Sequence, residues 1–215
     1  MGKVSVEEQT LSVPLIEWGA AVATLPGQAV SGDRFVVAPF ADGVLVAVAD
    51  GLGHGDDAAA AADVAVNILR AHAAEMIIPL VRRCHDALTR TRGVVLTLAS
   101  FNVTDDSMTW LGVGNAEGVL LRGPTGSAKA DSPREMVLLR GGVVGYQLPP
   151  LRASVLPVAR GDTLILASDG IRSGFADAVT LTDSAQRVAD RILIQYNKGT
   201  DDAIVLVARY LGGVP

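Results

Sequence analysis

The stretch Val-Leu-Val-Ala-Val-Ala-Asp-Gly-Leu-Gly-His-Gly, residues 44–55, decides the fold of this chain. Residues 44–49 are an apolar run of the length typical of a buried strand, and Asp50 and Gly51 follow it directly. The end of this strand therefore carries a carboxylate and a backbone that glycine leaves free to adopt unusual conformations. This combination is typical of half of a metal-binding site.

Acidic residues also stand at the ends of two later apolar runs. Asp169 and Gly170 follow the run 164–168, and Asp201 and Asp202 precede the run 203–208. Asp50 and Asp169 thus come after their strands, whereas the acidic pair comes before its own. For these carboxylates to meet, the last strand must run antiparallel to the other two.

A hairpin brings a fourth acidic motif to the same place. Residues 35–40 and 44–49 are predicted strands around Asp42-Gly43, a dipeptide typical of tight hairpin turns. Pairing across this turn puts residue 35 roughly opposite residue 50, so Asp33 lies within about two residues of Asp50. We therefore expect Ser31-Gly32-Asp33 to join the acidic cluster.

The remaining pattern indicates an α+β protein rather than alternating βαβ units. Strands 94–103, 108–114 and 118–121, joined by short turns, predict an antiparallel meander. The other predicted elements are a strand at 14–24, helices at 57–73 and 79–92, strands at 136–139, 153–158 and 163–167, and a helix at 183–196.

Length and composition limit the possible classes of protein. The 215 residues predict a single domain, 1–215, with residues 1–12 flexible. A net charge of -5 without a dense Lys/Arg run argues against nucleic acid as a partner. No apolar run approaches the roughly 20 residues that span a bilayer, and the N-terminus lacks a signal-peptide pattern. We expect a cytoplasmic monomer that binds no membrane.

Cysteine and basic residues add little to the predicted site. The single Cys84 excludes an intramolecular disulfide framework and a cysteine-rich zinc site, and its helical spacing predicts a place in the core. Arg82, Arg83, Arg90 and Arg92 are expected to form a solvated helix face, with docking of an acidic partner as the alternative. His72 and His85 are expected to be structural.

Several carboxylates at one sheet edge raise one another's pKa, and a divalent cation resolves this conflict. Carboxylate and carbonyl ligands favour Mg²⁺ or Mn²⁺. Two alternatives to a metal site remain. The Asp-Gly pairs could be ordinary turns, because Asp-Gly is a common turn dipeptide. The glycines at 51, 53 and 55 could instead form a nucleotide-phosphate loop. The second alternative lacks both the dinucleotide spacing and a P-loop lysine. The convergence of four acidic motifs favours the metal site.

In their order along the chain, these motifs resemble the metal-dependent serine/threonine phosphatases of the PPM (type 2C) class. The resemblance rests on residues 31–33, 50–55, 167–171 and 199–203, with further similarity at 110–115 and 141–148. It covers nearly the whole chain and is greatest to the SpoIIE/RsbX-like branch, in particular to the short RsbX-type phosphatases of stressosomes. It implies an αββα sandwich of two mainly antiparallel β-sheets flanked by helices.

The resemblance also implies a role for each acidic residue. Asp50 would bridge two divalent cations, Mn²⁺ or Mg²⁺, and the Gly51 carbonyl would hold the first. Asp169 and Asp201 would hold the second, and Asp33 would orient the attacking water. Asp202 would face the other way and support the site from outside, because neighbouring residues of a strand point in opposite directions.

The chain departs from this family's pattern at several positions. Leu52 stands where eukaryotic relatives have a general-acid histidine, so the leaving-group proton would come from metal-bound water or another group. His54 lies close to this position but is shifted, and a direct role for it is an alternative. Gln28 stands where those relatives have a phosphate-binding arginine. Ala203-Ile204 replaces a pair that usually ends in Thr or Ser, which weakens support of the site.

The implied activity is hydrolysis of phosphoserine or phosphothreonine by a metal-activated water, without a phosphoenzyme. The implied substrates are phosphorylated STAS-domain proteins of a stressosome or partner-switching pathway. Two other functions are compatible with the same residues: a catalytically weak phosphatase-like module that binds phosphorylated partners, and a small-molecule phosphohydrolase.

Overall fold

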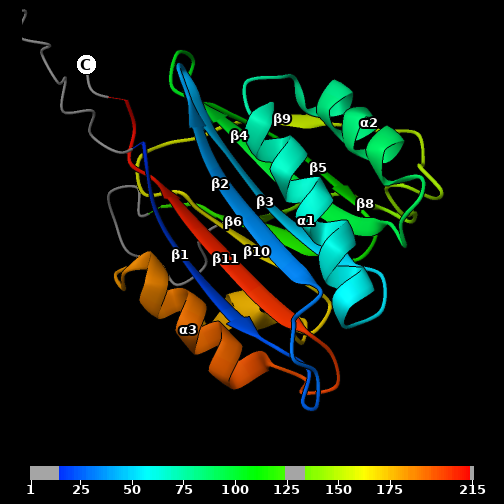
Figure 1. Ribbon diagram of the computed structural model, residues 1–215. Helices are drawn as coiled ribbons and strands as arrows, with labels where there is room; N and C mark the ends of the chain where they lie inside the picture. The colour runs from blue at the N-terminus through cyan, green and yellow to red at the C-terminus, as the bar shows by residue number, and fades with distance from the viewer. Residues whose placement is uncertain (1–14, 124–133, 214–215) are drawn as a thin grey trace, which may run out of the picture.

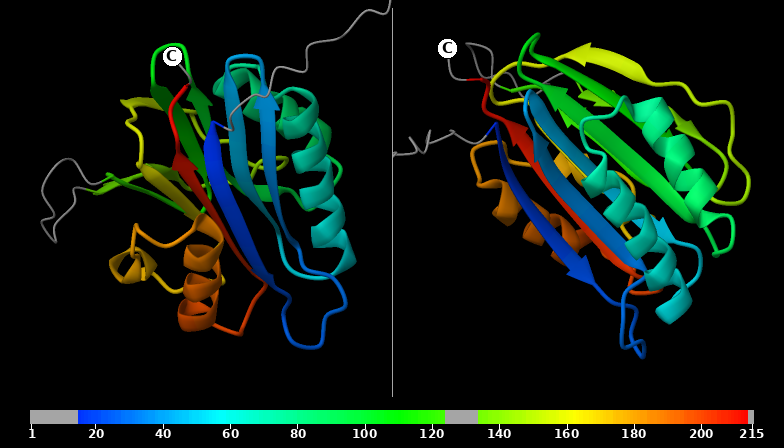
Figure 2. Two further views of the ribbon diagram at one scale, coloured as in Figure 1. Left: turned by 90° about the vertical axis from the view of Figure 1, so that its left-hand side faces the viewer. Right: turned by 45° about the horizontal axis from the view of Figure 1, so that its top comes forward.

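Two β-sheets pack face to face between layers of helices (Figure 1, Figure 2). The structure, a computed structural model, describes residues 15–123 and 134–213, so the segment 1–12 predicted to be flexible lies outside it. Helices α1 (Asp56–Ala71) and α2 (Ile77–Leu88) cover one sheet, and α3 (Ala185–Tyr196) covers the other. The predicted αββα sandwich of the α+β class is confirmed.

Sheet A, the sheet under α3, has five strands in the order β1-β11-β10-β6-β7. Its pairs are all antiparallel. The strands are β1 Ile16–Ala23, β11 Ala203–Tyr210, β10 Thr163–Ala167, β6 Glu117–Leu121 and β7 Arg134–Met136. The last strand therefore runs antiparallel to β10, as the acidic motifs required.

Sheet B, the sheet under α1 and α2, has the order β2-β3-β4-β5-β8, with β9 paired to β5. Its pairs are antiparallel except for β5 with β8. The strands are β2 Asp33–Phe40, β3 Gly43–Gly51, β4 Val94–Asn102, β5 Ser107–Val113, β8 Leu139–Arg140 and β9 Ser154–Pro157. A short 3₁₀ helix, Phe175–Ala178, follows β10.

The apolar run in β3 is continuous because both faces of the strand are buried. Leu45, Ala47 and Ala49 point into the core beneath α1 and α2. Val44, Val46 and Val48 alternate with them and point into the core between the sheets. Asp50 thus ends a strand held on both sides by apolar packing.

Among the helices of residues 15–123 and 134–213, none has the length and apolar character of a membrane-spanning segment.

Small side chains let α1 lie close to sheet B. Ala58, Ala61, Ala62 and Ala65 are fully buried at this contact. Cys84 of α2 is also in this core, as predicted, and burial raises the pKa of its thiol to about 12.

The hairpin register differs from the prediction by two residues. Asp33 lies directly opposite Asp50, and Phe35 lies opposite Val48. The turn is Ala41-Asp42, while Gly43 already belongs to β3. A Cβ atom on Gly43 would lie 2.0 Å from the carbonyl oxygen of Phe101, so this glycine serves close strand packing rather than the turn.

Three other predicted elements are also wrong in detail. The meander ends at β5, because β6 crosses into sheet A after Gly114, whose φ of 99° permits the sharp change of direction. The strand predicted at 136–139 is replaced by β7 and β8, which lie in different sheets. Helix α2 ends at Leu88, so Arg90 and Arg92 lie beyond it.

Candidate metal centre

The two sheets bring their acidic strand ends to one edge of the sandwich. Asp33 begins β2 and lies opposite Asp50, the second-to-last residue of β3. In the other sheet, Asp169 follows β10, and Asp201 precedes β11, with which β10 pairs. The carboxylates of Asp33 and Asp50 interact electrostatically with those of Asp169 and Asp201. The structure thus brings together the four acidic residues expected at the site.

Asp33 and Asp50 both resist ionisation. Burial, followed by the charges of Asp33 and Asp169, raises the pKa of Asp50 from 3.8 to about 8. Burial is also the largest cause that raises the pKa of Asp33 to about 7, against the opposing effect of a hydrogen bond from Ser168. Two neighbouring carboxylates that are costly to ionise are the situation that a bound cation relieves.

Ser168 connects the two sheets at this edge. Its hydroxyl donates to Oδ2 of Asp33 over 2.7 Å and accepts from the backbone N–H of Ile204 over 3.0 Å. One oxygen of Asp33 is thereby fixed, and its other oxygen can accept a hydrogen bond from water. The sequence pattern did not predict this contact, although Ser168 directly precedes Asp169.

Asp202 holds the backbone around the site. Its Oδ2 accepts from the N–H of Gly32, and its Oδ1 accepts from the N–H of Leu25, each over 2.7 Å. The side chain is buried, with 3% exposed. Both oxygens are therefore engaged in hydrogen bonds to the backbone.

Two glycines permit the close packing of these segments. A Cβ atom on Gly51 would lie 2.1 Å from the carbonyl oxygen of Ala58, and one on Gly170 would lie 2.0 Å from that of Asp202. Neither backbone group can move away cheaply, because each belongs to an ordered segment of the site. The glycine in each Asp-Gly pair is therefore a packing requirement and not only a turn former.

Asp169 has polar neighbours that the acidic motifs alone did not reveal. The amide of Asn115 donates to its Oδ2 over 2.7 Å, and the ammonium of Lys198 donates to its backbone carbonyl. Asn115 lies in the segment 110–115, whose resemblance to the PPM class was the available signal. Its hydrogen bond holds the Asp169 carboxylate at the edge shared by the two sheets.

The positions where the chain departs from the PPM pattern lie around the β3–α1 loop. His54 is exposed in this loop, and Leu52 is half-buried. A Cβ atom on Gly55 would lie 3.0 Å from Oε1 of Gln28, so the Gln28 side chain reaches this loop. Neither His72, which pairs with Glu75, nor His85, which accepts from the N–H of Gly145, lies at the acidic edge.

The donors at this edge suit a hard divalent cation. They are carboxylates and a backbone carbonyl, the oxygen ligands that Mg²⁺ and Mn²⁺ prefer. Within residues 15–123 and 134–213, no group of three or more His, Cys, Asp or Glu side chains is already arranged to hold an ion. The chemistry of these oxygen donors fits a divalent cation.

The chain is similar in sequence to a known protein family and to one characterised phosphatase. Residues 41–211 match the family described as Stage II sporulation protein E (SpoIIE). The phosphoserine phosphatase RsbX of Bacillus subtilis (strain 168) is 28% identical over 102 residues, which are 47% of this chain and 51% of that protein. The matched part thus spans about half the length of this relative.

Two solved structures resemble the whole described chain. One, from work on the bacterial stressosome as a modular system adapted to control secondary messenger signaling, is 28% identical with a TM-score of 0.80. The similarity covers 90% of this chain and 99% of that one. The other, RsbX in complex with magnesium, is 19% identical with a TM-score of 0.79 and coverages of 91% and 95%. At this identity the second likeness concerns the fold alone.

Proposed function

The chain belongs to the SpoIIE family, and from this membership we propose that it is a divalent-metal-dependent phosphatase acting on phosphoserine or phosphothreonine in proteins. The observation that carries the proposal is the meeting of Asp33 and Asp50 with Asp169 and Asp201 at one edge of the two sheets. The similarity to a phosphoserine phosphatase supports the reaction class.

Each acidic residue has a distinct role in this proposal. Asp50 and the Gly51 carbonyl would hold one cation, and Asp50, Asp169 and Asp201 would hold the second. Two divalent cations bound there would supply an activated water and neutralise the charge of the phosphoryl group. The carboxylate and carbonyl oxygens at this edge support a divalent ion as cofactor.

The protein's own groups orient the reactants around that centre. Asp33, with its Oδ2 fixed by Ser168, would accept a hydrogen bond from water through its other oxygen and set the water's direction of attack. Asn115 would keep the Asp169 carboxylate from rotating out of place. Because Leu52 cannot donate a proton, the leaving oxygen would receive its proton from metal-bound water or from another group.

We further propose that the substrates are phosphorylated STAS-domain proteins of a stressosome or another partner-switching pathway. Similarity to a structure from the bacterial stressosome and to RsbX supports this choice. A phosphoserine carries about -1.5 to -2 charges at neutral pH, so the cations would attract it despite the net charge of the protein. A folded phosphoprotein would also reach a site at an edge of the sandwich.

A dephosphorylation assay tests the proposal. Wild-type protein with Mn²⁺ should release phosphate from a phosphorylated STAS-domain protein, and chelator should stop the reaction. Asp50→Asn should lower the rate by about a thousandfold or more, the scale expected when a group that stabilises the transition state is lost. Asp86→Asn, which changes an exposed carboxylate of α2, is the matched control and should keep full activity.

The outcomes separate the alternative functions. Activity restricted to free phosphosugars would assign a small-molecule phosphohydrolase. Tight binding of the phosphoprotein without turnover would assign a phosphatase-like binding module. An Asp50→Asn protein as active as the wild type would disprove the metal-dependent mechanism.

A further inference from the structure

Arg92 lies beside the loop that leaves Asp50 and beyond the end of the helix in which the sequence pattern placed it. Helix α2 ends at Leu88, and strand β4 begins at Val94 opposite Gly51. The pairing continues beyond the strands, because the N–H of Leu52 donates to the carbonyl of Gly93 over 3.2 Å. The next residue outward, Arg92, is therefore adjacent to Gly53.

The guanidinium of Arg92 occupies space that only a glycine leaves open. A Cβ atom on Gly53 would lie 2.8 Å from Nη1 of Arg92, and the φ of Gly53 is 86°. An L side chain at this position would both strain the backbone and displace the guanidinium. The guanidinium of Arg92 therefore lies directly against the loop that follows Asp50-Gly51.

The present partner of Arg92 is easily exchanged. Its Nη2 lies 2.9 Å from Oδ2 of Asp57, with 49% of the arginine side chain and 73% of the aspartate side chain exposed. Such a solvated ion pair contributes little to stability, about 0–1 kcal/mol. A phosphate dianion offers a guanidinium two parallel charge-assisted hydrogen bonds and more charge than one carboxylate.

Two other described cations near the acidic edge are held by backbone carbonyls of the acidic motifs. Arg34 donates to the carbonyls of Ser31 and Asp33 and pairs with Asp63, so its guanidinium braces the start of β2. Lys198 donates to the carbonyl of Asp169. Arg92 combines exposure with a place on the loop next to Asp50-Gly51, where Gln28 offers no charge.

We propose that Arg92 is a substrate-binding residue that exchanges Asp57 for the phosphoryl oxygens of the substrate. It supplies the phosphate-binding cation that the chain lacks at Gln28, from a segment between α2 and β4. Asp57 competes with the phosphoryl group for the same guanidinium. This inference rests on the proposed phosphatase function, and it specifies how the substrate is held at that site.

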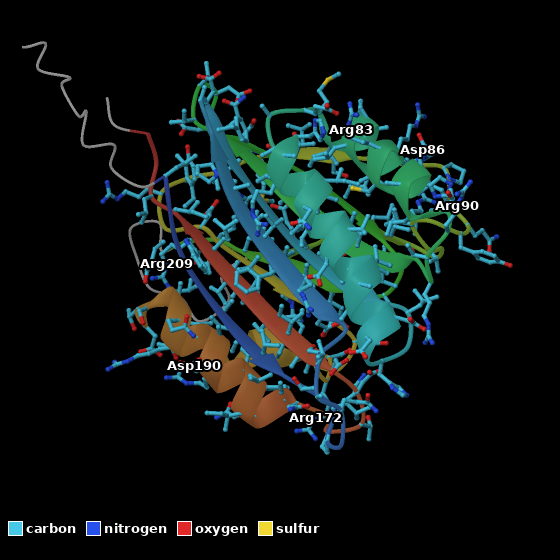
Figure 3. The ribbon with its side chains drawn as sticks, in the orientation of Figure 1. Arg83, Asp86, Arg90, Arg172, Asp190 and Arg209 are labelled. Atoms are coloured by element: carbon cyan, nitrogen blue, oxygen red, sulfur yellow. The ribbon has the colours of Figure 1, made fainter. Side chains whose placement is uncertain are left out.

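Opposite effects of two substitutions test the exchange. With 4-nitrophenyl phosphate and Mn²⁺, Arg92→Ala should raise KM about tenfold or more, the loss expected for a hydrogen bond to a charged group. Its kcat should stay within about threefold, since metal-based chemistry is retained. Arg92→Lys should be intermediate, and Asp57→Asn should lower KM. Arg90→Ala removes another exposed arginine, labelled in Figure 3, and should leave KM unchanged.

Direct binding of inorganic phosphate gives a readout that does not depend on turnover. Calorimetric titration into the Mg²⁺-loaded proteins should show weaker binding for Arg92→Ala and tighter binding for Asp57→Asn. Equal phosphate affinity in wild type and Arg92→Ala, or the same loss in Arg90→Ala, would overturn the inference. If the wild type binds phosphate through Arg92 but hydrolyses no phosphoprotein or aryl phosphate, the proposed function fails instead.

Discussion

Asp50 combines burial with proximity to other carboxylates, so its charged form is costly in the folded protein without metal. Its pKa is raised from 3.8 to about 8 by burial and by the neighbouring charges of Asp33, Asp169 and Asp201. Between these two pH values, the folded protein binds more protons than the unfolded chain. Stability therefore falls as pH rises through this range and levels off above it.

Asn at position 50 should remove the largest part of this pH dependence. In chelator, the wild-type Tm should fall between about pH 5 and about pH 8.5, whereas the Tm of Asp50→Asn should change less. At the upper end the variant should be the more stable protein, because it lacks the buried charge of Asp50. Thermal unfolding followed by circular dichroism measures both curves, with Asp86→Asn as the control. A wild-type Tm that rises across this pH range would contradict the assigned cause.

At the scale of single residues, the chemistry of the site was more predictable than its contacts. Asp50 and Asp169 could be placed at strand ends, because an apolar run followed by Asp-Gly is a local pattern. The partners of these residues come from distant segments. The bonds of Asn115 to Asp169 and of Ser168 to Asp33 join residues 54 and 135 positions apart. No local pattern contains that information.

At the scale of elements, the site depends on how closely the end of β10 approaches the start of β11. Gly170→Ala would place a Cβ atom 2.0 Å from the carbonyl oxygen of Asp202 and 2.9 Å from Cβ of Ala203. Since both neighbours are held by their own segment, the free energy of unfolding should fall by about 3 kcal/mol or more.

Gly141→Ala is the matched control, because a Cβ atom there would meet no other atom within 4 Å. Its effect should stay within about 0.5 kcal/mol. Urea unfolding of both variants measures the difference. A Gly170→Ala protein as stable as the wild type would show that this contact does not constrain the two strands.

Most strand positions were predicted well, whereas the exact register and some strand partners were not. The apolar run at 163–167 coincides with β10, and the predicted strand at 94–103 exceeds β4 by one residue. The predicted hairpin register was wrong by two residues, because Gly43 belongs to β3 and not to the turn. At that position the strand packs against the carbonyl oxygen of Phe101, which leaves no room for a Cβ atom. Likewise, β5 and β6 separate into different sheets at Gly114. Pairing depends on tertiary packing that periodicity does not encode.

At the scale of the whole molecule, the acidic residues join two sheets that otherwise meet through apolar packing. Asp33 and Asp50 lie in β2 and β3 of sheet B, while Asp169 follows β10 and Asp201 precedes β11 of sheet A. The αββα layering was implied by resemblance to a family, since the periodic pattern alone indicated only an α+β protein. The two-sheet arrangement makes the proposed cation a cross-link between the halves of the sandwich.

Hydrogen exchange should reveal this cross-link. Adding Mn²⁺ should slow amide exchange at the end of β3 and at the start of β11 together, because the ligands come from both strands. The far ends of the same strands serve as internal controls, since no proposed ligand lies there. Protection confined to one sheet would contradict a site shared by both.

Calorimetric titration of Mn²⁺ into the metal-free protein tests the central claim most directly. Asp33 and Asp50, with pKa values raised to about 7 and about 8, hold protons near neutral pH that a cation must displace. The wild type should bind two ions and release protons. The number of protons released is obtained from the change in observed binding enthalpy between buffers of different ionisation enthalpy. Asp50→Asn should lose both the binding and the release, while Asp86→Asn should retain them. Binding by Asp50→Asn with the affinity, stoichiometry and proton release of the wild type would contradict Asp50 as the bridging ligand.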